Sequence, residues 1–173
     1  MLHSIGRTAR DESVCGLLRG CHTRIRFFLD TAIAIESSSA PDDAIVDACQ
    51  DVERYFVQAF PLHLRDEEES ILPRIRGRSS RVDDALERMC GDHVAHAAPL
   101  AAMLDLAVSV RANPANRVMR SSLGSAASAL RGELEHHLQD EESTIFSAIE
   151  LLLSNETQAQ VVGEIRARRR TLA

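Results

Sequence analysis

The chain contains few aromatic residues: among its 173 residues there is no Trp and one Tyr, and only 3% are aromatic. Runs of β-branched residues bounded by turn residues are also missing, so we expect no β-sheet. No apolar run approaches the length of a membrane-spanning helix, and residues 1–10 lack the apolar region of a secretory signal. We therefore expect a cytoplasmic protein that has no membrane partner.

Cysteine occurs four times, at positions 15, 21, 49 and 90, and never in a C-x-x-C spacing. In a cytoplasmic protein these residues are interpreted as reduced, partly buried thiols, and Cys21 is interpreted as structural.

Positive charge is in deficit, and a net charge of −6 disfavours nucleic acid as a partner. The one basic run, at 166–170, is interpreted as the cationic end of a helix or a frayed tail.

The composition favours α-helix, because Ala, Leu, Arg and Glu dominate a chain that is 45% hydrophobic. Five helices are expected, at about 11–35, 41–75, 81–111, 117–153 and 156–169. Four long amphipathic helices with short polar loops predict an all-α, up-down-up-down four-helix bundle over residues 11–153. Residues 1–10, with His3, are expected to form a loose leader, and residues 154–173 a short extra C-terminal helix with a basic tail.

An internal repeat organises the chain. The segment that starts at His63 and the segment that starts at His137, 74 positions later, share seven of fourteen residues. The shared residues include a His followed four positions later by a Glu, and two Ile. Because residues four apart lie on one face of a helix, each His and its Glu project together. Both segments should therefore perform the same task.

Each His-x-x-x-Glu pair interrupts an apolar stripe of the kind that faces a core. The first stripe is Val52, Phe56, Phe60, His63, Glu67, Ile71 and Ile75, and the second is Ala127, Leu130, Leu134, His137, Glu141, Ile145 and Ile149. A buried carboxylate must be paired or must bind a metal, and neither stripe carries a Lys or Arg. Two such stripes that face each other predict a metal centre inside the bundle.

The other two long helices each carry a histidine near the middle of the apolar stripe, His22 and His93. One such histidine is more often a packed core group than a ligand. In an antiparallel bundle, however, the spacing can bring all four histidines to one level. Four imidazoles and two carboxylates exceed what one metal ion needs, whereas two ions bridged by both carboxylates would keep open positions for a small ligand. Nitrogen and oxygen ligands without thiolate suit Fe or Mn better than a structural zinc site.

This pattern resembles the hemerythrin-like family of His-His-Glu cation-binding four-helix bundles, over about residues 11–152. The elements that match are His22, His63-x-x-x-Glu67, Asp92-His93 and His137-x-x-x-Glu141. The resemblance implies the family fold and a non-haem centre of two iron ions of the Fe–O–Fe type, with Mn or Zn as substitutes. It implies that the protein binds or senses O₂, NO or peroxide, or handles iron.

Two departures separate the chain from the oxygen-carrying members. Those members have a further His four residues after the one on the third helix, where this chain has Ala97, and they end in His-x-x-x-x-Asp. The chain looks more like the branch that contains the di-iron repair-of-iron-centres proteins and the iron-sensing F-box hemerythrin domain. A di-iron enzyme (a peroxidase, NO reductase or ferroxidase) and an iron-centre repair protein are the alternatives. The protein partner is unknown, and a monomer and a homodimer are both compatible with the sequence.

Several residues beside the six ligands remain open. His96 fits a further ligand, a group that supports a ligand from outside, or a packed core residue. His136 should point about 100° away from its neighbour and lie on the surface. Glu68, Glu69 and Glu142 are interpreted as a solvated face, and Asp66 and Asp140 as groups that could orient a neighbouring histidine.

Overall fold

The structure is a computed structural model in which residues 12–170 are described, so the leader with His3 and the last three residues lie outside the described part. The described elements are α1 (Val14–Ala34), α2 (Asp42–Arg54), η1 (Tyr55–Ala59), α3 (Phe60–Arg65), η2 (Asp66–Ile71), α4 (Leu72–Ile75), α5 (Ser80–Ala112), α6 (Arg117–Asp140), η3 (Glu141–Ile145), α7 (Phe146–Leu152) and α8 (Asn155–Arg170). They are all helical, and no strand occurs between residues 12 and 170. Each predicted helix is found, with ends within three residues of the expected positions.

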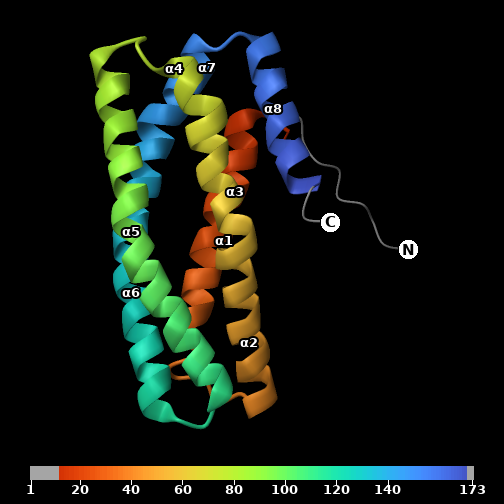
Figure 1. Cartoon of the computed structure of the whole chain (residues 1–173), viewed down its shortest axis with the longest axis vertical. Coiled ribbons are helices and arrows are strands. Elements are labelled where there is room, and N and C mark those ends of the chain that lie inside the picture. Colours follow the sequence, from red (N-terminus) through yellow and green to blue (C-terminus); the bar gives the residue numbers. More distant parts are fainter. Residues whose placement is uncertain (1–11, 171–173) are drawn as a thin grey trace.

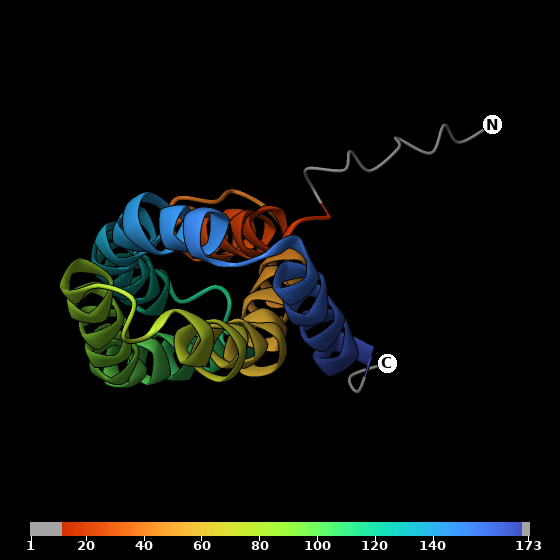
Figure 2. The ribbon, with the colours of Figure 1, turned by 90° about the horizontal axis from the view of Figure 1, so that it is seen from above.

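The helices form four long rods that alternate in direction, running down, up, down and up in the view of Figure 1. The first rod is α1, the second runs without a break from α2 to α4, the third is α5, and the fourth runs from α6 to α7. Viewed along the bundle, α8 lies outside the ring of rods, where it packs against α1 and η2 (Figure 2). The predicted all-α bundle with an extra C-terminal helix is therefore confirmed.

Short polar side chains fix where the rods begin. The Ser13 hydroxyl accepts a hydrogen bond from the N–H of Gly16 and caps α1, and Ser79 caps α5 in the same way. The Asn116 side chain caps α6 by accepting from the N–H groups of Val118 and Met119. These caps satisfy backbone donors that the first turn of each helix leaves without a partner. These three caps help to fix the register of α1, α5 and α6, whereas α2 begins after Pro41 without a side-chain cap.

The core consists of two hydrophobic clusters, one in each half of the bundle. Ile25, Phe60 and Leu138 belong to the lower cluster, whereas Leu18, Ile71 and Ile145 belong to the upper one. α8 adds Val161 and Ile165 to the upper cluster. Both predicted stripes of the repeat are buried throughout, so each rod contributes apolar side chains above and below one polar level. That level holds the candidate site.

Three short π-helical segments interrupt the rods, and two of them contain the carboxylates of the repeat. In η2 the carbonyl of Glu67 accepts from the N–H of Leu72, and in η3 the carbonyl of Glu141 accepts from the N–H of Phe146. A π-turn holds more residues than an α-turn, so successive steps of four stay on one face. This is why the stripes remain buried although their spacing exceeds the α-helical repeat.

The buried faces of the other two rods follow the α-helical period. Beyond His96 the buried row of α5 passes through Met103, Ala107 and Val110, whereas Leu100 and Leu104 are only half-buried. Near the end of α1 the buried residues are Leu29 and Ala32, a step of three.

Within residues 12–170, one helix, α5, is long and apolar enough to cross a membrane by length and composition alone. This is weak evidence, because the core helix of a bundle passes the same test. In this fold α5 contributes His93, Met103 and Ala107 to the buried interior.

Candidate metal centre

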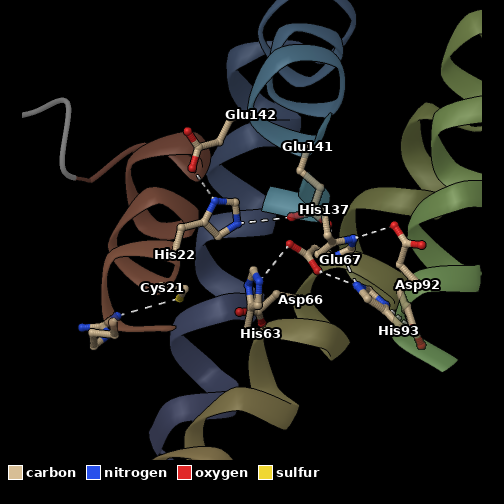
Figure 3. A network of polar contacts seen from close by, with 12 residues as sticks. Cys21, His22, His63, Asp66, Glu67, Asp92, His93, His137, Glu141 and Glu142 are labelled. Carbon is tan, nitrogen blue, oxygen red and sulfur yellow. Dashed lines mark hydrogen bonds and ion pairs between the residues drawn. The ribbon is translucent and has the colours of Figure 1, made fainter. Parts of the chain in front are cut away.

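Six polar side chains from the four rods meet between the two hydrophobic clusters (Figure 3). They are the six residues that the sequence predicts as ligands: His22, His63, Glu67, His93, His137 and Glu141. All six are buried, and His93 is the most accessible at 9%. The structure therefore brings together every one of these predicted residues.

The side chains form two overlapping groups whose ligand atoms lie within 4.8 Å of one another. The first group is His22, His63, Glu67 and Glu141, and the second is His93, His137 and Glu141. Each group contains one histidine from each of two neighbouring rods. The imidazole rings are 5.1 Å apart in the first pair and 4.9 Å apart in the second, measured between centroids. Two positions for a cation thus share a carboxylate.

Glu67 lies between the two histidine pairs. Its Oε1 atom is 3.3 Å from Nε2 of His63, and its Oε2 atom is 3.4 Å from Nε2 of His93. One oxygen therefore faces each cation position, as a bridging carboxylate requires.

Glu141 has the same relation to the other two histidines. Its Oε2 atom is 3.3 Å from Nε2 of His22, and its Oε1 atom is 3.2 Å from Nε2 of His137. Nε2 of His93 lies 4.0 Å from the same Oε1 atom. Both carboxylates of the repeat are thus placed to bridge the same two positions.

The inner atoms of the cluster lack hydrogen-bond partners among the described residues. They include both carboxylate oxygens of Glu67 and of Glu141, and Nε2 of His22 and of His93. Buried polar atoms in proteins nearly always have partners, because an unsatisfied one costs about 1–3 kcal/mol. Buried carboxylate oxygens and imidazole nitrogens aimed at common points fit a pair of cations.

The electrostatics of the cluster indicate the same need for positive charge. Burial and the negative charge of Glu141 raise the pKa of Glu67 well above its usual range. Burial acts in the same direction on Glu141, but the imidazoles of His137 and His22 outweigh it and lower the pKa of Glu141. Burial, followed by the neighbouring His22, lowers the pKa of His63 well below its usual value, which keeps this imidazole neutral as a metal ligand must be.

Carboxylates outside the cluster hold the far side of three of the four imidazoles. Glu142 lies 2.8 Å from Nδ1 of His22, and Glu68 lies 2.7 Å from Nδ1 of His93. Glu68 is exposed and Glu142 partly exposed, so both do face solvent as expected, but their contacts to the cluster histidines were not predicted. A partner on Nδ1 fixes the tautomer and turns Nε2 toward the centre. The sequence feature that could have predicted these contacts is the Glu-Glu pair shared by both copies of the repeat. In each copy the second Glu contacts a histidine on a neighbouring rod.

Asp92 is the third outer carboxylate, with Oδ2 3.3 Å from Nδ1 of His137. The two aspartates of the repeat do not contact a cluster histidine through any described hydrogen bond. Asp66 is fully buried and accepts from Arg168 at 2.9 Å and from Arg169 at 2.6 Å. Asp140 is exposed and lies 3.5 Å from Arg88. The basic run is therefore not a frayed tail, since two of its arginines close over a buried carboxylate.

The remaining residues singled out by the sequence lie outside both ligand groups. His96 packs edge-on against His137 at 5.5 Å between centroids, and His136 is exposed as expected. None of the four cysteines belongs to either group among the described residues. Burial raises the pKa of the Cys15 thiol, and likewise that of Cys49, to about 11, so neither thiol is poised to react.

An apolar cavity of about 220 Å³ approaches the centre between the second and third rods. His93, a member of the cluster, and His96 line it, and its other lining residues are apolar and include Phe56, Phe60 and Leu100. An uncharged molecule could therefore come close to the His93 side of the cluster without crossing a charged surface.

Comparison with known proteins agrees with this arrangement. The family model for the hemerythrin HHE cation binding domain matches residues 15–149, which is most of the chain and contains all six cluster residues. The chain therefore belongs to the hemerythrin HHE cation-binding family, and its buried His/Glu cluster is consistent with a metal site. A search of curated proteins found no match to the chain.

Proposed function

We propose that the protein holds two iron ions and uses them to bind or sense a small ligand such as O₂, NO or peroxide. His22 and His63 would hold one ion, and His93 and His137 the other, with Glu67 and Glu141 as bridges. The observation that carries the proposal is the placement of the two carboxylates. In each of them, one oxygen lies near one histidine pair and the other oxygen near the other pair, with oxygen-to-Nε2 distances of 3.2–3.4 Å.

Iron is favoured over other metals by the donor set. Imidazole nitrogens and carboxylate oxygens without thiolate suit Fe and Mn, and Zn is a further substitute. Bound iron supplies a reversible change of oxidation state and open positions for an exogenous ligand. The protein's own residues would orient the imidazoles, neutralise the metal charge with two carboxylates, and exclude bulk water by burial.

The apolar cavity supports an uncharged ligand. His93 and His96 are its only polar lining residues among those described, and its other lining residues offer no charged side chain. Burial lowers the pKa of His96, so this imidazole is neutral at physiological pH and adds no charge to the approach. A molecule such as O₂ or NO would therefore not have to lose a tightly held hydration shell on the way.

The same cavity is the observation that favours an enzyme as a second candidate. A volume of about 220 Å³ exceeds what a diatomic molecule needs and would admit a small organic peroxide. Turnover of peroxide or NO well above that of free iron would favour a peroxidase or NO reductase over a sensor. No described residue pattern outside the centre indicates an iron-centre repair activity.

Metal analysis followed by rapid mixing tests the proposal. Protein purified without chelator should contain about two iron ions per chain and should absorb in the region of oxo-to-iron charge transfer. The di-ferrous protein should change its spectrum within the mixing experiment when O₂ or NO is added. The absence of a spectral response to both gases would refute ligand binding, and a metal content near zero after reconstitution would refute the centre itself.

A matched pair of variants separates the centre from adventitious surface iron. Glu141 belongs to both ligand groups, so Glu141→Ala should lose both ions. Glu87 is exposed on α5 and belongs to neither group, so Glu87→Ala should keep two. Equal iron content in the two variants would show that the iron lies elsewhere.

A further inference from the structure

Two seams between neighbouring rods border the cluster, and the internal repeat relates them. The first seam lies between α1 and the second rod at Asp66 and Glu67, and the second lies between α5 and the fourth rod at Asp140 and Glu141. The two aspartates, like the two glutamates, are 74 positions apart. Because the two segments of the repeat share this pattern, similar openings would be expected at the two seams.

α8 removes this equivalence by covering the first seam. Arg168 and Arg169 both donate to Asp66, and the Nη2 atom of Arg169 also lies 3.4 Å from the sulfur of Cys21. Asp66 is fully buried as a result. Two guanidinium groups therefore lie over this seam, where their positive charge would repel an approaching cation.

The second seam is covered by no described element and keeps a narrow opening of about 10 Å³. Asp92, Asp140 and Arg88 line it on the outside, and His137 and Glu141 line it on the inside. The Asp92 and Asp140 side chains are 45% and 66% exposed, and Arg88 lies 3.5 Å from Asp140. The opening thus has two carboxylates and one cation at its mouth, and a volume close to that of a single water.

We propose that this second seam is the route by which divalent cations enter the centre, with Asp140 as the residue that attracts them and Arg88 as a movable gate. The inference rests on the proposed binuclear centre. Behind the mouth lies Glu141, which is 2% exposed and has two oxygens without a hydrogen-bond partner among the described residues. A cation at Asp140 would therefore find the next free carboxylate directly inside.

The alternative approaches are less suited to a hydrated dication. The apolar cavity at His93 offers few groups to replace lost water ligands, and removing a charge from water costs several kcal/mol. The first seam presents Arg168 and Arg169. Cations and uncharged ligands would therefore reach the centre by different paths, the acidic seam and the apolar cavity.

The rate of metal uptake by the metal-free full-length protein tests the route. Co²⁺ is the probe, followed by its visible absorption after rapid mixing at low ionic strength. Asp140→Asn should slow uptake and Arg88→Gln should speed it, each by about 3- to 10-fold, because one charge at the mouth changes the local potential for a dication. Both variants should reach the same final cobalt content and equilibrium affinity as the parent, because neither residue belongs to a ligand group.

Asp105→Asn is the matched control, since Asp105 is exposed on α5 away from the seam and its loss changes the net charge by the same amount. Its uptake rate should equal that of the parent. The proposal is overturned if Asp140→Asn and Asp105→Asn load at the same rate, or if Asp140→Asn lowers the equilibrium affinity, which would make Asp140 part of the centre. Failure of the parent to bind cobalt would instead refute the proposed centre, and the entry route with it.

Discussion

Nδ1 of His22 lies 2.8 Å from a carboxylate oxygen of Glu142, although the two residues are 120 positions apart in the chain. The same carboxylate oxygen lies 3.1 Å from a guanidinium nitrogen of Arg26, so its position is set from two sides. Because one ring nitrogen is engaged outside, the other, Nε2, points at Glu141. The orientation of a ligand on the first rod is thus decided by a residue on the fourth.

Loss of this outer contact should weaken the metal position of His22. We expect Glu142→Ala to lower the affinity for the more weakly bound metal ion by about 10- to 100-fold, as is typical when the partner of a metal-binding histidine is removed. Glu142→Gln, which keeps an acceptor oxygen, should lose less. Competition with a chromophoric chelator measures both affinities.

The control for this variant is Glu87→Ala, which removes an exposed carboxylate that contacts neither ligand group. It should bind metal like the parent. An unchanged affinity in Glu142→Ala would mean that the packing of the His22 ring, rather than its outer hydrogen bond, fixes the orientation.

The bundle and its polar level could be predicted because the relevant signals are local and periodic. The stripes through His63 and His137 contain enough apolar residues to define a buried face, and the repeat shows that both faces carry a His-x-x-x-Glu pair. All fourteen stripe positions are buried in the structure. The place of His22 and His93 in the middle of their helices then predicted the common level.

Contacts between rods could not be predicted in the same way. Glu68 and Glu142, which contact cluster histidines on other rods, lie within η2 and η3, and no residue type in the repeat marks a π-turn. Pro73 follows η2, but Ser147 occupies the equivalent place after η3, so proline is not the cause common to both. The burial of Asp66 likewise depends on where α8 docks.

Glu67 should destabilise the metal-free protein. Its pKa is raised well above the usual range by burial and by the charge of Glu141. An acid whose folded pKa lies above its unfolded value lowers stability as pH rises through the interval between them. We therefore expect Glu67→Gln to stabilise the chelator-treated protein by about 1–4 kcal/mol at pH 7, as the replacement of buried charges often does.

The pH dependence provides the check on Glu67→Gln. Urea unfolding of both metal-free proteins should give a difference in free energy that shrinks toward pH 4.5, the ordinary value for a Glu side chain. In the presence of metal the order should reverse, because the variant loses a bridging oxygen. A variant that is less stable than the parent in both conditions would contradict this account.

The ion pair between Arg26 and Glu135 should make a small contribution to the free energy of unfolding, and acid should remove this contribution. Hydrogen bonds from Arg26 are the main cause that lowers the pKa of Glu135 from 4.5 to about 2. A depressed acid pKa stabilises the fold above the unfolded value, and this contribution is lost as pH falls from 4.5 to about 2. Because both side chains are partly exposed, Glu135→Gln should cost only about 0.5–1 kcal/mol at pH 7.

Urea unfolding at pH 7 and near pH 2.5 measures the effect, with the parent compared at each pH so that other groups cancel. Glu133→Gln is the control, since Glu133 is exposed on the same helix. A cost of Glu135→Gln that persists undiminished in acid would show that the side chain acts through packing rather than charge.

Among the ion pairs considered, the pairing of Asp66 with the arginines of α8 should contribute most to the free energy of unfolding. Its carboxylate is fully buried, and burial raises its pKa while Arg169 and Arg168 act to lower it. The double variant Arg168→Ala/Arg169→Ala leaves this charge without its two cations, so we expect a loss of about 3–5 kcal/mol at pH 7. Asp66→Asn in the same background should recover most of that loss, because a neutral amide costs less to bury.

Arg170→Ala, which removes an exposed arginine from the same helix, is the control for the double variant and should have little effect. If Asp66→Asn gives no recovery, the two arginines stabilise the fold by holding α8 against the bundle rather than by compensating the buried carboxylate.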